Sequence, residues 1–258
     1  MRKEGGNIRL IVTDLDDTLL RSDHLPSEFT VETFRMCREK GILTAFATAR
    51  VSIATKAEYQ ALKPDIRVVS NGAMALAGEE LLFFDRIPVE EANRFCRCLK
   101  QKGAKRILAG CFAHTYWENR EIAASRTLKE AVYHDFSEPI GEDAAQISFS
   151  LEDPRALGEV REAFPELSWT SYRGGRCAVM APGVSKAAGV AKAAELFGVK
   201  LSEILAFGDD AGDLEMLTKC GVGVAMGNAI PELKEAADYV AETNDEDGAA
   251  KFIRGYIV

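Results

Sequence analysis

The chain of 258 residues is 47% hydrophobic and 28% charged, which is typical of a folded globular protein and excludes disorder as its dominant state. Its 32 basic and 40 acidic residues give a formal net charge of −8. This balance argues against a nucleic acid as partner, because binding a nucleic-acid backbone needs clustered Lys and Arg. An anionic substrate would therefore need a local positive site.

The cysteines and the N-terminal stretch indicate the cellular compartment in which we expect the protein. Six cysteines occur without a C-x-x-C pair, which predicts reduced thiols in a cytoplasmic protein. The apolar run Ile8–Val12 follows a charged start and is too short for a signal sequence or a membrane span. We expect no membrane partner, and the sequence indicates no particular oligomeric state.

The run Ile8–Val12 ends abruptly in an acidic cluster. Its β-branched residues are typical of a strand covered on both faces of a parallel sheet. Asp14 and Asp16 follow at the spacing of two that points side chains to one side. Crowded carboxylates favour a bound cation or a shared proton, and open parallel sheets bind ligands at this end of their strands. The cluster predicts metal-assisted chemistry; an acidic turn with Thr18 capping a helix is the alternative.

Two further strands alternate with helices after this cluster. We expect a helix over Pro26–Lys40, a strand over Ile42–Ala47, a helix around Ser52–Leu62 and a strand over Arg67–Ser70. The β-α-β order predicts parallel strands joined by right-handed connections. The strand ends, which precede Thr48 and Asn71, should therefore face the same side as Asp14.

From about Leu81 the pattern loses its strict β-α alternation, which favours an inserted α+β domain over residues 79–181. The last two strands of this region are joined by the hairpin-like Gly174-Gly175. The expected elements are helices over Pro88–Lys102, Glu121–Val132 and Asp153–Phe164, and strands over Lys105–Cys111, His114–Trp117, Gln146–Leu151, Leu167–Tyr172 and Arg176–Met180.

Regular alternation resumes at Pro182. Ser185 can cap a helix over Lys186–Phe197, and a strand over Glu203–Phe207 runs into the acidic stretch Gly208–Asp213. Two more β-α units follow. The predicted fold is α/β, with a doubly wound, mostly parallel Rossmann-like core built from residues 1–78 and 182–258 and interrupted by the insert.

Five side chains fall at strand ends or at a helix start in this core, so we expect the fold to bring them together: Asp14, Asp16, Thr48, Lys186 and Asp209. Asp14, first out of its strand, is the candidate nucleophile, because an ionised carboxylate can form an acyl phosphate that water cleaves. Asp16 can protonate the leaving oxygen and later accept a proton from water. Thr48, Lys186 and a bound Mg²⁺ would position the phosphoryl group and neutralise its oxygens.

Mg²⁺ prefers oxygen ligands and typically takes one or two carboxylates. Asp14 and Asp209 are the expected pair, with Asp213 near them. Arg50 and Asn71 are weaker candidates for substrate contact, since an exposed Arg and a turn Asn also explain them. The other candidates have structural readings too: Thr48 as the end of a strand, Gly208-Asp209 as a simple turn.

Four motifs, taken in order, resemble those of the haloacid dehalogenase superfamily phosphatases. They are Asp14-Leu15-Asp16-Asp17-Thr18, Ala47-Thr48-Ala49-Arg50, Gly183-Val184-Ser185-Lys186, and Gly208-Asp209 with Asp213. Through the later runs 223–229 and 244–248, the chain is similar to the Cof-type phosphatases of that superfamily. The resemblance covers about residues 8–76 and 180–254.

The resemblance implies a Mg²⁺-dependent phosphomonoesterase that works through an aspartyl phosphate on a small phosphorylated metabolite, a sugar phosphate or a phosphorylated cofactor. It implies that Asp16 also offers its backbone carbonyl to the metal. The insert would be a cap that covers the site, excludes water and selects the leaving group. The sequence departs from the family pattern at Gly212, where Asn is usual, and at Ala49, where Gly is frequent.

Three alternatives stay open. A haloacid dehalogenase would share the nucleophile but makes no use of Asp16 as an acid or of Asp209 as a metal ligand. A phosphosugar mutase of the same superfamily would return the phosphoryl group to a sugar, and release of inorganic phosphate distinguishes the two. A catalytically silent phosphometabolite-binding protein stays possible because of Gly212. A metal-dependent hydrolysis assay that compares wild type with Asp14→Asn distinguishes such a protein from an enzyme.

Overall fold

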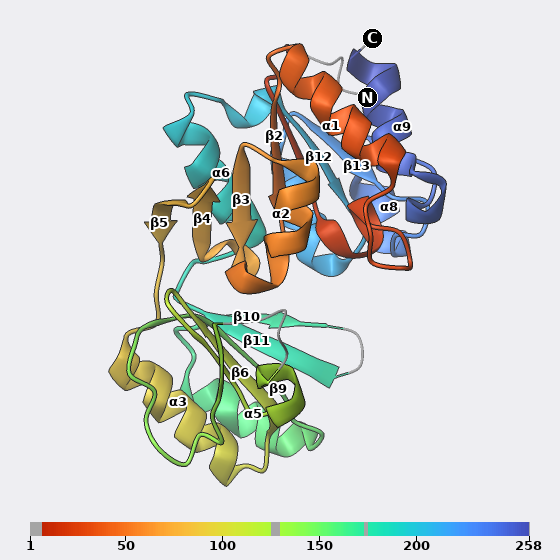
Figure 1. The fold of residues 1–258 in the computed structure, drawn as a ribbon. Helices are drawn as coiled ribbons and strands as arrows, with labels where there is room; N and C mark the ends of the chain where they lie inside the picture. Colours follow the sequence, from red (N-terminus) through yellow and green to blue (C-terminus); the bar gives the residue numbers. More distant parts are fainter. Residues whose placement is uncertain (1–6, 125–129, 173–174, 258) are drawn as a thin grey trace. The chain divides into compact units, whose positions relative to one another are not determined.

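The computed structural model of the chain describes residues 7–124, 130–172 and 175–257, which form two compact units (Figure 1). The first unit comprises the described residues up to 49, residues 55–83, and those from 185 onward. The second unit comprises residues 50–54 and the described part of 84–184. The predicted fold class, a doubly wound α/β core interrupted by an α+β unit, is confirmed.

An eight-stranded sheet forms the centre of the first unit, in the order β14-β13-β12-β1-β2-β3-β4-β5. β1 lies parallel to β12 and β2, and β13, β14 and β3 continue this direction outward, whereas β4 is antiparallel to β3. The carboxyl ends of the parallel strands therefore meet at one edge. The strands are β1 Leu10–Thr13, β2 Leu43–Ala47, β3 Ile66–Val69, β4 Met74–Ala77, β5 Glu80–Phe84, β12 Ile204–Gly208, β13 Val222–Ala225 and β14 Tyr239–Val240.

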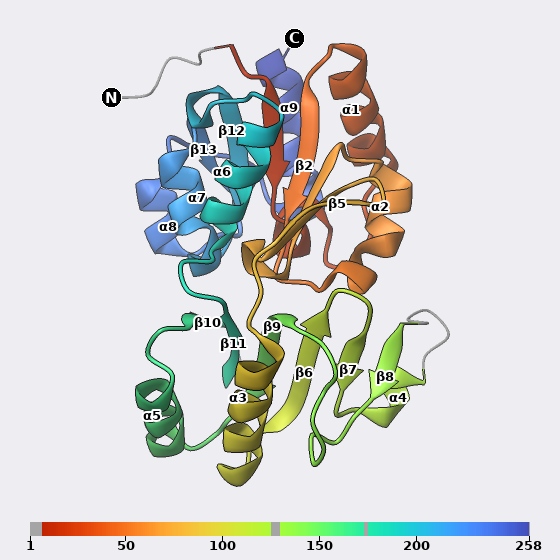
Figure 2. The ribbon, with the colours of Figure 1, turned by 90° about the vertical axis from the view of Figure 1, so that its left-hand side faces the viewer.

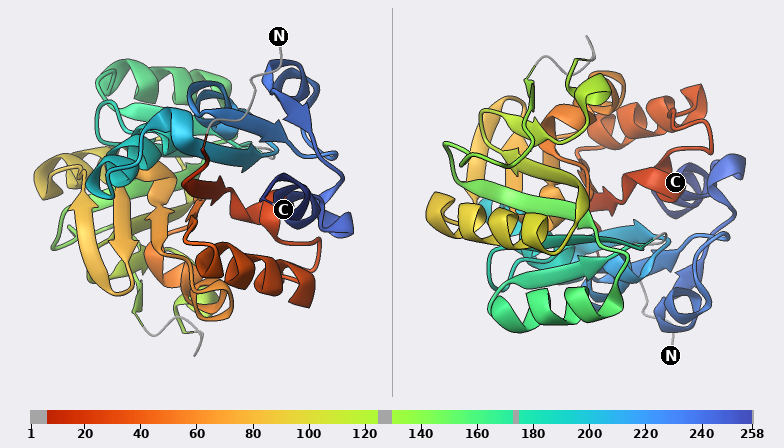
Figure 3. Two further views of the ribbon diagram at one scale, coloured as in Figure 1. Left: turned by 90° about the horizontal axis from the view of Figure 1, so that it is seen from above. Right: turned by 90° about the horizontal axis from the view of Figure 1, so that it is seen from below.

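Helices cover both faces of this sheet (Figure 2, Figure 3). α1 packs with α2 and α9, and α7 packs with α6 and α8. Because both faces are covered, the central strands are almost continuously apolar, and Ile11, Phe46 and Phe207 are fully buried. The helices are α1 Glu28–Glu39, α2 Lys56–Leu62, α6 Lys186–Leu196, α7 Leu214–Lys219, α8 Pro231–Ala236 and α9 Gly248–Ile257.

The second unit contains a six-stranded sheet in the order β10-β11-β9-β6-β7-β8. Its pairings are antiparallel except that of β7 with β8. Phe95 of α3 makes edge-to-face contacts with Phe149, Phe164 and Trp169, so an aromatic cluster ties α3 to the sheet and to the end of α5. The elements are α3 Val89–Gln101, β6 Lys105–Cys111, β7 Thr115–Trp117, α4 Arg120–Ala123, β8 Ala131–Tyr133, β9 Ala144–Ser150, α5 Pro154–Ala163, β10 Ser168–Ser171 and β11 Arg176–Met180.

The structure corrects one predicted element of this unit. The helix expected over Glu121–Val132 is wrong, because α4 ends at Ala123 and residues 131–133 form strand β8. Residues 125–129 lie outside the described part of the chain. Val132, the last residue of the expected helix, pairs instead with Tyr116 of β7, and Tyr133 pairs with Trp117. Their β-branched and aromatic side chains suit that sheet position.

A strand pair at the edge of the first sheet was not foreseen. The sequence predicts no strand between Ser70 and the helix expected at Pro88, but the structure has β4 and β5 in this stretch. Gly78 has φ +59 and supplies the left-handed turn between them. For the other turn that the sequence singled out, Gly174 lies outside the described residues.

Candidate active site

Asp14 lies at the carboxyl end of β1 and is 7% exposed. Its backbone N–H donates to the Phe207 carbonyl of β12 at 3.0 Å, so the hydrogen bonding of the sheet extends to this residue. The chain then enters a tight turn, η1 Leu15–Leu19, in which Asp16 and Asp17 have non-helical backbone angles. Strand pairing on one side and this turn on the other hold a buried carboxylate at the edge of the sheet.

Lys186, in the first turn of α6, contacts that carboxylate. Its Nζ lies 3.0 Å from Asp14 Oδ1 and donates to Asp213 Oδ1 at 2.7 Å. The Ser185 side chain caps the helix by accepting from the Ala188 N–H at 3.1 Å. A cation is unfavourable at a helix N-terminus, so the two carboxylates must offset the helix dipole. The chain therefore stabilises a buried ammonium group beside Asp14.

Two glycines allow α6 to come this close. A Cβ on Gly72 would lie 2.0 Å from the Ser185 carbonyl oxygen, and Gly72 has φ +98. A Cβ on Gly189 would lie 2.6 Å from the Gly72 Cα and 2.9 Å from Val68 Cγ1. Neither position accepts a side chain without moving the backbone. Helix α6 is thus seated against the turn η3 Ser70–Gly72, which sets the position of Lys186.

The end of β12 supplies two more buried carboxylates. Asp209 is 5% exposed and accepts a hydrogen bond from Thr18 Oγ1 at 2.8 Å. Asp213 is fully buried, and its Oδ2 accepts from the backbone N–H groups of Asp209 and Asp210 at 3.1 and 3.3 Å. Because Lys186 occupies Oδ1, both oxygens of Asp213 have protein partners. Asp209 offers the freer oxygens.

Burial shapes the protonation of this group. Burial raises the pKa of Asp14 well above its usual range; Lys186 opposes this shift, and Asp213 and Asp209 add to it. Burial also raises the pKa of Asp209 to about 7, against the lowering effect of the Thr18 hydrogen bond. For Lys186, burial alone would lower the pKa, but Asp14 and Asp213 outweigh it and raise the value. One ammonium group therefore does not relieve three crowded carboxylates.

The same crowding fits a divalent cation. Asp14, Asp209 and Asp213 each offer a carboxylate oxygen, and these atoms lie within 4.8 Å of one another. Carboxylate oxygens are ligands that Mg²⁺ prefers, and a divalent ion would lower the cost of burying these charges. In this donor set, Asp14 and Asp209 are better placed than Asp213, whose oxygens hold Lys186 and two backbone N–H groups.

Thr48 and Asn71 lie at the same ends of the neighbouring strands. Thr48 follows β2 and is buried, and its carbonyl accepts from the Asn71 N–H at 3.0 Å. Asn71 is also buried, has φ +56, and belongs to η3, which packs on α6. Arg50 belongs to the second unit, where its guanidinium donates to the Ala54 carbonyl at 3.5 Å. The roles of all three in substrate contact stay predictions.

Asp16 differs from the other acidic residues. Its side chain is 41% exposed, and its Oδ1 lies 3.6 Å from His24 Nδ1. The turn that carries it also supplies Thr18, to which the sequence analysis assigns no role beyond a possible helix cap and its place in the first motif. The sequence gives no local signal for the bond from Thr18 to Asp209, since 191 residues separate them; the family motif, which includes this Thr, was the available indication.

Comparison with known proteins identifies the class. Residues 11–253 match the model of a family described as haloacid dehalogenase-like hydrolase. The chain is 30% identical over 269 residues to the 5-amino-6-(5-phospho-D-ribitylamino)uracil phosphatase YcsE of Bacillus subtilis, covering 100% of this chain and 99% of that one. It is 31% identical over 241 residues to the HMP-PP phosphatase of Escherichia coli, covering 88% and 86%.

A solved structure agrees with these relatives. A sugar phosphatase of subclass IIB of the superfamily superposes with a TM-score of 0.82 at 26% sequence identity, covering 96% of this chain and 98% of that one. The chain therefore belongs to the haloacid dehalogenase-like hydrolases. Within this family it is a phosphatase. Among the described residues, no helix has the length and apolarity needed to cross a membrane.

Proposed function

We propose that the protein is a Mg²⁺-dependent phosphomonoester hydrolase that transfers the phosphoryl group of a small metabolite to Asp14 and then to water. The observation that carries this proposal is the buried Asp14 carboxylate, which lies 3.0 Å from Lys186 Nζ and within 4.8 Å of the Asp209 and Asp213 oxygens. This group combines a nucleophile, a fixed positive charge and a cation-binding donor set in one place.

In the first half-reaction, an Asp14 oxygen attacks phosphorus and the bond to the leaving oxygen breaks. Asp16 donates a proton to that oxygen, and its partial exposure suits a group that meets the departing alcohol. In the second half-reaction, Asp16 takes a proton from a water molecule that attacks the phosphorus of the aspartyl phosphate. This attack releases inorganic phosphate and restores the Asp14 carboxylate.

Charge neutralisation supports both steps. Lys186 and the hydroxyl of Thr48 would hold phosphoryl oxygens, which carry the charge of the transition state. The carboxylates of Asp14 and Asp209, with Asp213 nearby, and the backbone carbonyl of Asp16 would hold Mg²⁺. When bound, this ion supplies positive charge that neutralises the phosphoryl group and stabilises the ionised carboxylates.

The substrate class follows from the relatives. Their names specify a phosphorylated ribitylamino-uracil, HMP-PP and a sugar phosphate as substrates. We infer that this protein acts on a small phosphorylated metabolite of the same kind, either a sugar phosphate or a phosphorylated cofactor, in the cytoplasm. Residues 79–181 would serve as the cap that excludes water and selects the leaving group, with Arg50 and Asn71 as substrate contacts.

A screen of phosphorylated metabolites with and without Mg²⁺, with inorganic phosphate as the product measured, tests this function. Wild-type protein should release phosphate only with Mg²⁺, and Asp14→Asn should abolish release. Glu39→Gln, which changes an exposed carboxylate of α1, is the matched control and should be unaffected. Transfer to a second sugar without phosphate release would indicate the mutase, and binding without turnover would indicate the silent binding protein.

A further inference from the structure

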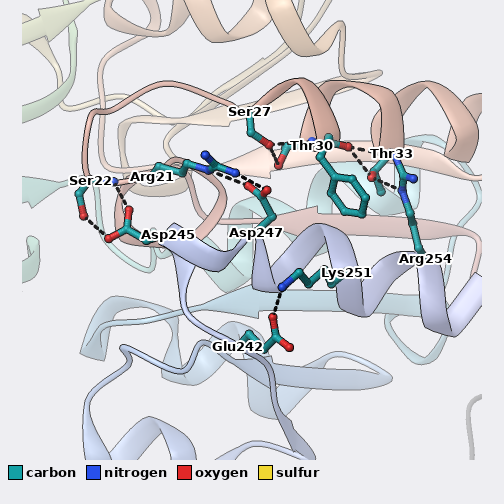
Figure 4. Close-up of polar contacts among 11 residues, drawn as sticks. Arg21, Ser22, Ser27, Thr30, Thr33, Glu242, Asp245, Asp247, Lys251 and Arg254 are labelled. Atoms are coloured by element: carbon teal, nitrogen blue, oxygen red, sulfur yellow. Dashed lines mark hydrogen bonds and ion pairs between the residues drawn. The ribbon is translucent and has the colours of Figure 1, made fainter.

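The C-terminal segment that includes residues 242–254 reaches across the first unit to the chain that follows Asp16. Figure 4 shows its outer contacts: Asp245 accepts from the Ser22 N–H and Oγ at 2.9 and 2.8 Å, and Asp247 pairs with the Arg21 guanidinium. Further along, Arg254 donates to Thr33 Oγ1 of α1 at 2.8 Å. The segment is therefore anchored both to the loop between η1 and α1 and to α1 itself.

Two asparagines make the inner contacts of this arrangement. Asn244, which is buried, donates from Nδ2 to the Leu20 carbonyl at 3.0 Å. Asn228, which follows β13, donates from Nδ2 to the Asp17 carbonyl at 2.7 Å. The Asn244 N–H in turn donates to Asn228 Oδ1 at 3.1 Å. The Asn228 side chain thus binds both the Asp17 carbonyl and the Asn244 backbone, and the Asn244 side chain binds the Leu20 carbonyl, so the two residues together hold both ends of the turn Asp17–Leu20.

This turn needs external support. Asp17 has φ +55, a conformation that is strained for a residue with a side chain and persists only where its surroundings enforce it. Asp16, immediately before it, is 41% exposed, so packing constrains its carboxylate little. The backbone of the turn sets the position from which that side chain extends, and Asn228 and Asn244 hold this backbone.

We propose that Asn228 and Asn244 are positioning residues for Asp16, which they hold in the geometry needed to protonate the leaving oxygen. This inference rests on the proposed function, because it takes Asp16 as the acid. It adds a role for two residues that the sequence places only within the runs 223–229 and 244–248 of the family resemblance.

A comparison of two aryl phosphates of similar shape distinguishes a positioning role of the asparagines from a general effect on protein stability. Phenyl phosphate releases a more basic oxygen than p-nitrophenyl phosphate, so its cleavage depends more strongly on an acid. We would measure kcat/KM, which reports the transfer to Asp14, for both esters with Asn228→Ala and Asn244→Ala. A partly unfolded variant loses both activities in proportion, so the ratio of the two values is independent of the folded fraction.

The expected result is a loss of about tenfold with phenyl phosphate and less than about twofold with p-nitrophenyl phosphate, since a positioned acid contributes about 100-fold or more. Glu242→Gln, which removes the exposed ion pair to Lys251 in the same segment, is the control and should leave the ratio unchanged.

An unchanged ratio in both asparagine variants, with wild-type protein active on both esters, would overturn the positioning role and leave the proposed function intact. A wild-type protein that releases phosphate with Mg²⁺ neither from these esters nor from the phosphorylated metabolites of the screen would overturn the proposed function, and the inference with it.

Discussion

The approach of α6 to η3 makes Gly189 a sensitive test of how the site is assembled. In Gly189→Ala, the new Cβ would lie 2.6 Å from the Gly72 Cα and carbonyl oxygen, where ordinary contacts begin at 3.4 Å. The obstacle is backbone, so α6 must move by about 0.8 Å. Overpacking of this kind costs about 1–3 kcal/mol of stability.

Because Lys186 lies one turn before Gly189 in the same helix, the shift also moves its Nζ away from Asp14. A misplacement of about 1 Å in a catalytic group costs about 100-fold in rate, so kcat/KM should fall by between about tenfold and 100-fold. Phosphate release and urea unfolding are the two assays, and unfolding shows how much of the loss is stability.

Gly158→Ala is the matched control, since this glycine also lies in a helix but a Cβ there meets nothing within 4 Å. It should keep full activity and gain about 0.4–1 kcal/mol. The reasoning is refuted if Gly189→Ala retains wild-type activity and stability, because α6 would then not be held by this contact.

Three further predictions follow from local geometry. Gly212→Asn should fold normally, because a Cβ at this position meets nothing within 4 Å. It should raise kcat/KM by about fivefold, since the new amide gains one hydrogen bond of about 1 kcal/mol to the phosphate. An unchanged kcat/KM would contradict this prediction. In native protein at pH 8, iodoacetamide should modify the half-buried Cys98 before Cys37 and Cys96. Burial raises the pKa of Cys37 to about 11 and of Cys96 to about 12, so these thiols are rarely ionised. Peptide mass spectrometry would detect the order in which the cysteines are modified. In metal-free protein, the folded pKa of Asp209 is raised to about 7, and the stability that this shift contributes is present below the pKa of the unfolded chain and is lost as pH rises through about 7. The difference in Tm between wild type and Asp209→Asn should therefore shift against wild type from pH 5 to pH 8, and Mg²⁺ should reverse this shift. A Tm difference that stays constant would contradict the prediction.

The parallel core was predictable because each central strand is a short apolar run that ends in polar residues. Asp14, Thr48 and Asp209 each follow such a run, and strands β1, β2 and β12 are neighbours in the sheet. Parallel pairing puts their carboxyl ends at one edge, so residues almost 200 positions apart in the chain become neighbours. Periodicity and strand order were sufficient for this part of the site.

The rest depended on contacts that no local pattern encodes. The sequence places Lys186 at the start of a helix, but the glycine contact that seats this helix involves Gly72, more than 100 residues away. Asn228 and Asn244 resemble ordinary turn residues, and only the structure joins them to the turn after Asp16. Strand β8 was not predicted because Ala131 and Val132 fall within the helix expected over Glu121–Val132.

The central claim is that Asp14 accepts the phosphoryl group, and Asp16→Ala allows this to be measured directly. The variant lacks the proposed base that activates water, while p-nitrophenyl phosphate needs little help from an acid. Rapid mixing with Mg²⁺ should give a burst of one p-nitrophenolate per enzyme, and mass spectrometry of the acid-quenched protein should place one phosphoryl group on Asp14. A burst with Asp14 unmodified, or steady phosphate release from Asp14→Ala, would contradict the account.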